Sequence, residues 1–152
     1  MTQTQTQTHG SISKTAALEL VREIHARFSA GKLDACLELV TDDIEVSLYP
    51  MGQTFRGREE FVQFMQVFHS AFPDIALRHT NEVVDGDQVA VEFTWNGTNT
   101  GPIMTPGGPI EPTGKRVEGA HVMEMFRLRG GKVTRIGNYQ DIAAWMRQLG
   151  LA

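Results

Sequence analysis

The sequence predicts an α+β fold in which helices come first, antiparallel strands follow and one helix closes the chain. Apart from one alternating segment at Ile44 to Leu48, the apolar residues up to residue 72 recur with the period of a helix. From residue 75 they alternate with polar ones, as in half-buried strands. Two turns, Asp85-Gly86 and Gly130-Gly131, have the composition that joins strands into hairpins. We expect a curved antiparallel sheet wrapped around the N-terminal helices, giving a cone with one internal pocket, the usual place for a ligand.

Size and charge narrow the class of protein. The chain has 152 residues, which is the length of one ordinary domain. Its net charge of −4 argues against a nucleic-acid partner bound through phosphate neutralisation. Its single cysteine gives no sign of an oxidising compartment. Because the sequence shows neither a secretory signal nor an apolar run long enough for a membrane span, we expect a cytoplasmic protein with no membrane partner.

The first residues differ in composition from the rest. They read MTQTQTQTHG, with no aliphatic residue after Met1. Such a segment buries too little apolar surface to offset the entropy lost on ordering. We therefore expect residues 1–11 to be a disordered tail and residues 12–152 to form a single domain.

Three helices are expected in the first half of the chain. Ser13 caps the first helix and Gly31 ends it. A short second helix carries Cys36 on its apolar stripe, which favours a buried side chain over a nucleophile. The third helix runs between Gly57 and Pro73, and its aromatic stripe predicts core packing. The stripes of the first and third helices comprise Ala17, Leu20, Val21, Ile24 and Phe28, and Phe61, Phe64, Met65, Phe68 and Phe72.

Strands and a final helix account for the remainder. The segment 99–116 holds four of the six prolines and four glycines, so we expect a long loop that is either a lid or a rigid surface connection. Asp141 caps the last helix, whose apolar stripe includes Trp145. The expected strands are Ile44 to Leu48, Ile75 to Val84, Gln88 to Trp95, Val117 to Arg129 and Lys132 to Tyr139.

A series of short motifs runs through the last two-thirds of the chain. In order, they are Ala71–Asp74, Asn96–Thr98, Gly101-Pro102, Pro112–Lys115, Phe126-Arg127, Gly131–Val133, Asp141 and Gln148–Gly150. With these motifs in this order and spacing, the chain resembles the SnoaL-like polyketide cyclase family of the nuclear-transport-factor-two-like superfamily. The fold of that superfamily hosts cyclases, isomerases, hydrolases and non-catalytic binding modules.

The resemblance implies an intramolecular aldol condensation that uses no metal or organic cofactor. In such cyclases an acidic residue near the end of the last strand acts as acid and base, and a histidine on the neighbouring strand assists. Matching Phe126-Arg127 and Gly131–Val133 places the acidic residue at Asn138 and the histidine at Glu124. Both positions are substituted here, and an amide cannot carry a proton. This chain therefore cannot copy the cyclase mechanism residue for residue.

Glu124 and Asn138 are the candidate catalytic residues. Glu124 shares a strand face with Val122, and if that face lines the pocket, desolvation would raise the pKa of Glu124 and suit it to acid/base work. The alternative is a surface glutamate on the wet face of a strand. Asn138 could donate to an oxyanion or could simply be a polar residue at a strand end.

Candidate substrate-binding residues surround this pair. Tyr49 and Trp95 could form an aromatic mouth for a flat apolar ligand, although ordinary packing explains them equally. Val122 would line the pocket beside Glu124, and His121 is either a ligand contact or a core or interface histidine. Since His121 and Glu124 point to opposite faces of a strand, they cannot share a metal ion, and we expect no metal site.

Two classes of function remain open. The first is a cofactor-free enzyme that moves protons on a small apolar carbonyl compound, as a polyketide cyclase or an isomerase does. The second is a non-catalytic ligand-binding or dimerisation module of the same fold. By analogy with the family, we expect a homodimer formed through the outer face of the sheet, where His121, Met123 and Met125 would make an exposed row.

Overall fold

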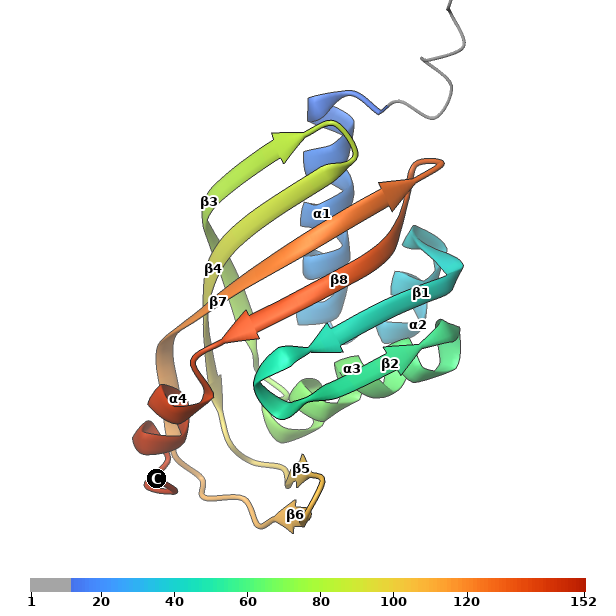
Figure 1. Ribbon diagram of the computed structural model, residues 1–152. Coiled ribbons are helices and arrows are strands. Elements are labelled where there is room, and N and C mark those ends of the chain that lie inside the picture. The colour runs from blue at the N-terminus through green and yellow to red at the C-terminus, as the bar shows by residue number, and fades with distance from the viewer. Residues whose placement is uncertain (1–11) are drawn as a thin grey trace, which may run out of the picture.

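The computed structural model describes residues 12–152 and confirms the α+β class (Figure 1). The predicted tail, residues 1–11, lies outside the described residues. The helices are α1 (Lys14–Ser29), α2 (Leu33–Cys36), α3 (Gly57–Ala71) and α4 (Ile142–Gln148), with 3-10 turns at Leu37–Leu39 and Tyr49–Met51. The strands are β1 (Val40–Leu48), β2 (Gln53–Arg56), β3 (Ala76–Asp85), β4 (Gln88–Thr98), β5 (Ile103–Thr105), β6 (Gly108–Ile110), β7 (Arg116–Arg129) and β8 (Lys132–Gln140).

Six strands form the main sheet in the order β2-β1-β8-β7-β4-β3. The expectation of a purely antiparallel sheet is wrong at one place, because β1 pairs in parallel with β8. Parallel neighbours need a long crossover connection, and here the whole chain between β1 and β8 supplies it. The short edge strand β2, which pairs with β1, was not expected because its four residues show no clear alternation.

Helices α1 and α3 cover one face of this sheet (Figure 1). Helix α1 begins as predicted, with the side chain of Ser13 accepting a hydrogen bond from the backbone of Ala16 at 3.1 Å. The aromatic stripe of α3 is buried against the sheet. None of the helices within residues 12–152 has the length and apolarity to cross a membrane.

Irregularities in three strands shape the sheet. The pairing of β3 with β4 shifts between His79 and Asn81, and the pairing of β4 with β7 shifts between Trp95 and Gly97. Such bulges bend a strand and increase its twist. In β7, Gly119 has a left-handed backbone with φ of 64°. The alternation of inward and outward side chains along the strand changes at this residue. As a result Glu118 is exposed, although regular alternation would have placed it on the inner face with Glu124.

The segment 99–116 is more ordered than a simple loop. Strands β5 and β6 pair within it as a small hairpin. Asn99, which is fully buried, holds the segment to the domain through four side-chain hydrogen bonds. Its Nδ2 donates to the carbonyls of Ala71 at 3.2 Å and Gly101 at 2.8 Å. Its Oδ1 accepts from the backbone N–H of Thr113 at 2.8 Å and from the hydroxyl of Thr113 at 3.0 Å.

The segment passes so close to α3 that Gly101 has no room for a side chain. A Cβ at this position would lie 1.9 Å from the carbonyl oxygen of Ser70. We expect Gly101→Ala to lower the free energy of unfolding by about 1–3 kcal/mol, the usual cost of overpacking, as measured by urea denaturation. Gly107→Ala is the control, because its nearest neighbour would be Thr105 Oγ1 at 3.8 Å. Equal stability of the two variants would refute this close approach.

Candidate active site

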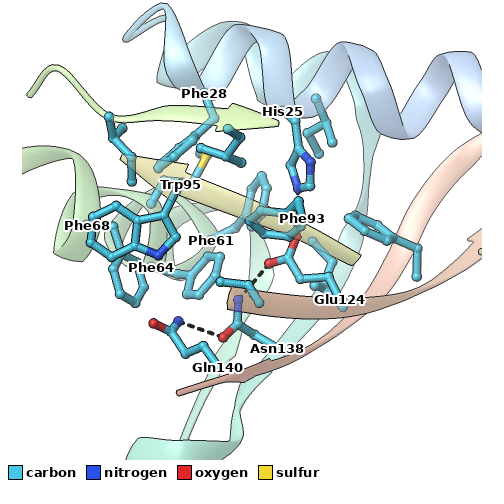
Figure 2. A pocket seen from close by; sticks show the side chains of 17 residues that line it. His25, Phe28, Phe61, Phe64, Phe68, Phe93, Trp95, Glu124, Asn138 and Gln140 are labelled. Carbon is cyan, nitrogen blue, oxygen red and sulfur yellow. Dashed lines mark hydrogen bonds and ion pairs between the residues drawn. The ribbon is translucent and has the colours of Figure 1, made fainter. Parts of the chain in front are cut away.

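A cavity of about 60 Å³ lies between α1, α3 and the inner face of the sheet. Its walls are mainly aromatic and aliphatic, and Figure 2 shows the rings surrounding a small group of polar side chains. At about 10–15 Å³ of such volume per water molecule, the space holds only a few waters. The phenylalanines that line it are Phe28, Phe61, Phe64, Phe68, Phe93 and Phe126.

The two predicted catalytic residues meet on the wall of this cavity. Glu124 on β7 and Asn138 on β8 are direct partners across the two strands. Both are nearly buried, with 5% and 4% of their surface exposed. Asn138 Nδ2 donates a hydrogen bond to Glu124 Oε2 at 2.8 Å (Figure 2). Glu124 therefore faces the cavity, as predicted, and not solvent.

The direction of that hydrogen bond is set from outside the cavity by a tryptophan. The indole N–H of Trp145, which can only donate, bonds to Gln140 Oε1 at 3.0 Å. The amide of Gln140 must then present its Nε2, which donates to Asn138 Oδ1 at 2.8 Å. Asn138 is left with its N–H groups facing Glu124. The closing helix therefore fixes which end of Asn138 the carboxylate meets.

A histidine on α1 completes the polar group, and it was not among the predicted site residues. His25 Nε2 lies 2.7 Å from Glu124 Oε1. The His25 ring also packs edge-on against Phe93, with the ring centroids 4.8 Å apart. A signal was available in the sequence, since His25 lies four residues after Val21 and three before Phe28, on the apolar face of the helix.

A second histidine and a glutamate continue from His25 toward the surface. His79 and Glu82 on β3 are three residues apart, so a regular strand would point them to opposite faces. The bulge between His79 and Asn81 changes the phase. His79 Nδ1 can thus approach Glu82 Oε2 to 2.7 Å. Burial lowers the pKa of His79 below its ordinary value.

Glu82 is held ionised by Arg22 of α1, which bonds to both of its oxygens. These bonds lower the pKa of Glu82 from 4.5 to about 2. The ionised form is thus favoured in the fold, and the stability it provides is present above pH 4.5 and lost as the pH falls toward 2. In thermal unfolding, we expect the wild type to lose more stability across this range than Glu82→Gln. Identical pH slopes would contradict this contribution.

The four predicted substrate-binding residues divide between two faces of the sheet. Trp95 and Val122 line the cavity. The expectation that Tyr49 and His121 contact a ligand there is wrong in placement, because both are exposed on the other side. On β7, His121 lies three residues before Glu124, so its side chain points to the opposite face of the sheet. Tyr49 follows the buried Leu48 at the end of β1 and turns outward.

Tyr49 instead belongs to a cluster on the outer face. Its ring stacks on that of Tyr139 with the centroids 4.6 Å apart, and its hydroxyl accepts from Arg135 Nη2 at 3.1 Å. The hydroxyl of Tyr139 foremost, and then Ser47 and Arg135, lower the pKa of Tyr49 through their polar contacts with its hydroxyl. The outer face therefore carries aromatic surface that is separate from the cavity.

Other reactive groups do not form a second centre in the part of the chain that is described. Within residues 12–152, no three histidine, cysteine, aspartate or glutamate side chains are grouped so as to hold a metal ion. Cys36 is fully buried, as predicted, and desolvation raises the pKa of its thiol to about 11. A thiol with so high a pKa is a poor nucleophile at neutral pH.

With the geometry established, comparison with known proteins identifies the family. Residues 21–136, more than half of the chain, match the SnoaL-like domain. The chain belongs to the SnoaL-like family. No curated protein matches this SnoaL-like chain in sequence.

Solved structures show the same fold. A proposed SnoaL-like polyketide cyclase from Jannaschia sp. CCS1 is 23% identical, with a TM-score of 0.80 over 93% of this chain and 97% of that one. AclR, a proposed hydroxylase from Streptomyces galilaeus, is 24% identical, with a TM-score of 0.78 over 92% and 88%. IdmH, a proposed polyketide cyclase from Streptomyces antibioticus, is 26% identical, with a TM-score of 0.72 over 88% and 98%.

Proposed function

We propose that this SnoaL-like protein is a cofactor-independent enzyme that moves a proton on a small apolar carbonyl compound, in an aldol cyclisation or an isomerisation. The observation that carries the proposal is the hydrogen-bonded pair of Glu124 and His25, buried among phenylalanine rings. An acid and a base held together in an apolar cavity are what proton abstraction next to a carbonyl requires.

The two substitutions relative to the family pattern compensate for each other in this proposal. Asn138 has taken the place implied for the acidic residue, but the carboxylate is present directly across the sheet at Glu124. The histidine implied at position 124 is replaced in function by His25, which reaches the carboxylate from α1. The cavity thus keeps one carboxylate and one imidazole, but the carboxylate comes from β7 instead of β8, and the imidazole comes from α1 instead of β7.

In the proposed reaction, Glu124 removes a proton from the carbon next to the carbonyl and later returns it. Asn138 orients the carboxylate through Oε2 and has a second N–H that can donate to the enolate oxygen. The aromatic walls favour an apolar ligand. Since proton transfer at carbon needs only a base and a donor to oxygen, we expect no cofactor.

The cavity volume sets a condition on the ligand. A space of about 60 Å³ is well below the volume of about 300 Å³ or more that small-ligand sites have, so we expect binding to displace some of the phenylalanine rings. Phe28 of α1 is half-buried, whereas Phe61 and Phe64 of α3 are buried, which makes the α1 side the easier one to open. Trp95 and Val122 are proposed as fixed contacts on the sheet side.

The test requires no knowledge of the natural substrate. The protein is incubated in D₂O with a panel of apolar ketones and β-keto esters, and deuterium entering next to the carbonyl is followed by proton NMR. We expect protein-dependent deuteration of at least one compound. If compounds bind, as judged by shifts in the protein spectrum, but none is deuterated above the buffer rate, the enzyme proposal fails.

That outcome would favour the second candidate, a non-catalytic ligand-binding module. Asn138 is the observation that supports it, because Asn138 stands where the family pattern has the acidic residue and its amide cannot carry a proton. The two candidates differ in one result: both predict binding of apolar carbonyl compounds, and only the enzyme predicts deuteration.

We also propose that the protein is a homodimer formed through the outer face of the sheet. Met125, Tyr49 and Tyr139 are 37%, 46% and 45% exposed there and line one depression, so together they form an apolar patch that a monomer would leave in contact with water. In sedimentation velocity at micromolar concentration, we expect a dimer for the wild type and a monomer for Met125→Asp. Met104→Asp, at an exposed methionine in β5, is the control. A monomeric wild type would contradict this proposal.

A further inference from the structure

An unbroken line of hydrogen bonds joins the carboxylate in the cavity to a carboxylate at the surface. From Glu124 Oε1 it passes to His25 Nε2 at 2.7 Å, from His25 Nδ1 to His79 Nε2 at 2.7 Å, and from His79 Nδ1 to Glu82 Oε2 at 2.7 Å. Each imidazole uses its Nε2 for the contact nearer the cavity and its Nδ1 for the contact nearer the surface. Arg22 binds the outer end.

This line contains one proton more than two neutral histidines provide. Each of the three contacts needs a hydrogen, since at 2.7 Å two bare lone pairs would repel. Two neutral imidazoles bring two N–H groups, and an ionised carboxylate brings none. A third hydrogen must therefore be held in the line. It can sit on Glu124, on His25 or on His79 without breaking any of the three contacts.

The surroundings favour the inner positions for that hydrogen. Glu82 is excluded because the bonds from Arg22 lower its pKa to about 2. Burial lowers the pKa of His79, so the charged form of this ring is the less favoured one. Phe93 packs against both imidazoles, with centroid distances of 4.8 Å to His25 and 6.1 Å to His79, so both rings lie beside an apolar side chain.

We propose that Glu124, His25, His79 and Glu82 form a proton relay that carries protons between the cavity and the solvent. The relay rests on the proposed function in one respect, because it supplies the protons that Glu124 would use there. It adds two positioning residues on α1 and β3 that neither the sequence pattern nor the family match assigns.

The proposed step conserves every proton. The hydrogen on Glu124 Oε1 moves to His25 Nε2, while the hydrogen on His25 Nδ1 moves to His79 Nε2. His79 keeps the hydrogen on its Nδ1, which stays bonded to Glu82. Glu124 is then a carboxylate ready to act as a base, and the positive charge lies on His79 next to the anion of Glu82. Exchange with water follows at this outer end.

The relay can be tested without any ligand by ¹⁵N NMR of histidine-labelled protein between pH 5 and 8. The charged groups near the line are Glu19 and Arg22 on α1, Glu82 on β3 and Glu124 on β7. In every arrangement above, His79 Nδ1 carries a hydrogen, so we expect this nitrogen to be protonated throughout. We further expect Glu124→Gln to change the titration of His79, two hydrogen bonds away.

The matched control is Glu118→Gln, an exposed glutamate on the same strand, which should leave the titration of His79 unchanged. An unprotonated His79 Nδ1, or a titration of His79 that is the same in the wild type and in Glu124→Gln, would overturn the relay. Both results are independent of whether the protein turns over any substrate.

A second measurement applies once a deuterated ketone is known. His79→Gln keeps a hydrogen-bonding side chain but cannot pass a proton, so we expect about 10-fold slower exchange of the abstracted proton with solvent, at unchanged KM. Added imidazole should restore part of the rate in His79→Ala, which leaves room for the ring, and not in His79→Gln, whose side chain fills the site. His121→Gln should match the wild type. Deuteration that is unaffected by His79→Gln would overturn the relay and leave the proposed role of Glu124 intact.

Discussion

Replacing Glu124 by Gln is expected to lower the rate of ketone deuteration by about 100-fold or more, the range that positioned acids and bases contribute. The amide of glutamine has nearly the same shape and can still bond to Asn138 and His25, so the fold should persist. It cannot accept a proton from carbon. Deuterium incorporation at saturating ketone, followed by NMR, measures the effect directly.

Two controls separate chemistry from stability in this experiment. Glu118→Gln removes the same charge from the same strand at an exposed position and should keep the wild-type rate. Urea denaturation of Glu124→Gln should show a folded protein at the assay temperature. If folded Glu124→Gln deuterates the ketone as fast as the wild type, another residue is the base.

The largest effect on stability is expected from Asn99→Ala. The side chain of Asn99 makes four hydrogen bonds while fully buried, and its removal leaves the carbonyls of Ala71 and Gly101 and the backbone N–H of Thr113 with fewer partners. At about 1–3 kcal/mol for each buried group left unsatisfied, we expect the free energy of unfolding to fall by about 3 kcal/mol or more.

The comparison for this variant is Asn81→Ala. Asn81 is exposed and its side chain makes one hydrogen bond, to Glu92, so its loss should cost less than about 0.5 kcal/mol, as is usual for surface substitutions. Urea denaturation of both proteins gives the two differences on one scale. Equal losses would mean that Asn99 does not anchor the segment 99–116.

Local patterns in the sequence predicted most of the elements. The caps at Ser13 and Asp141 and the two glycine turns depend on neighbouring residues only. The structure has each of them, with the first turn one residue later than predicted, at Gly86-Asp87. The parallel pairing of β1 with β8 could not be predicted in this way, because it joins segments from opposite ends of the chain. The phase change at Gly119 was also hidden, since it depends on pairing with a bulged partner strand.

The residues of the candidate site also differ in whether local sequence patterns could predict them. Glu124 and Asn138 could be selected because alternation along β7 and the family motifs both point to them. His25 could have been noticed as a histidine on the apolar face of its helix. Its contact with His79 could not be predicted, since that contact joins a helix to a strand 54 residues later and requires the bulge in β3. Tyr49 was misplaced for a similar reason: its direction depends on the turn after β1, which periodicity does not describe.

The most direct measurement for the proposed active site is a crystal structure with a ketone that cannot lose a proton next to its carbonyl. We expect the ketone to occupy the cavity with the blocked carbon next to Glu124 and its oxygen near Asn138. We also expect some phenylalanine rings on the α1 side to have moved. A ketone bound instead on the outer face, at Tyr49 and Tyr139, with the cavity unchanged, would contradict it.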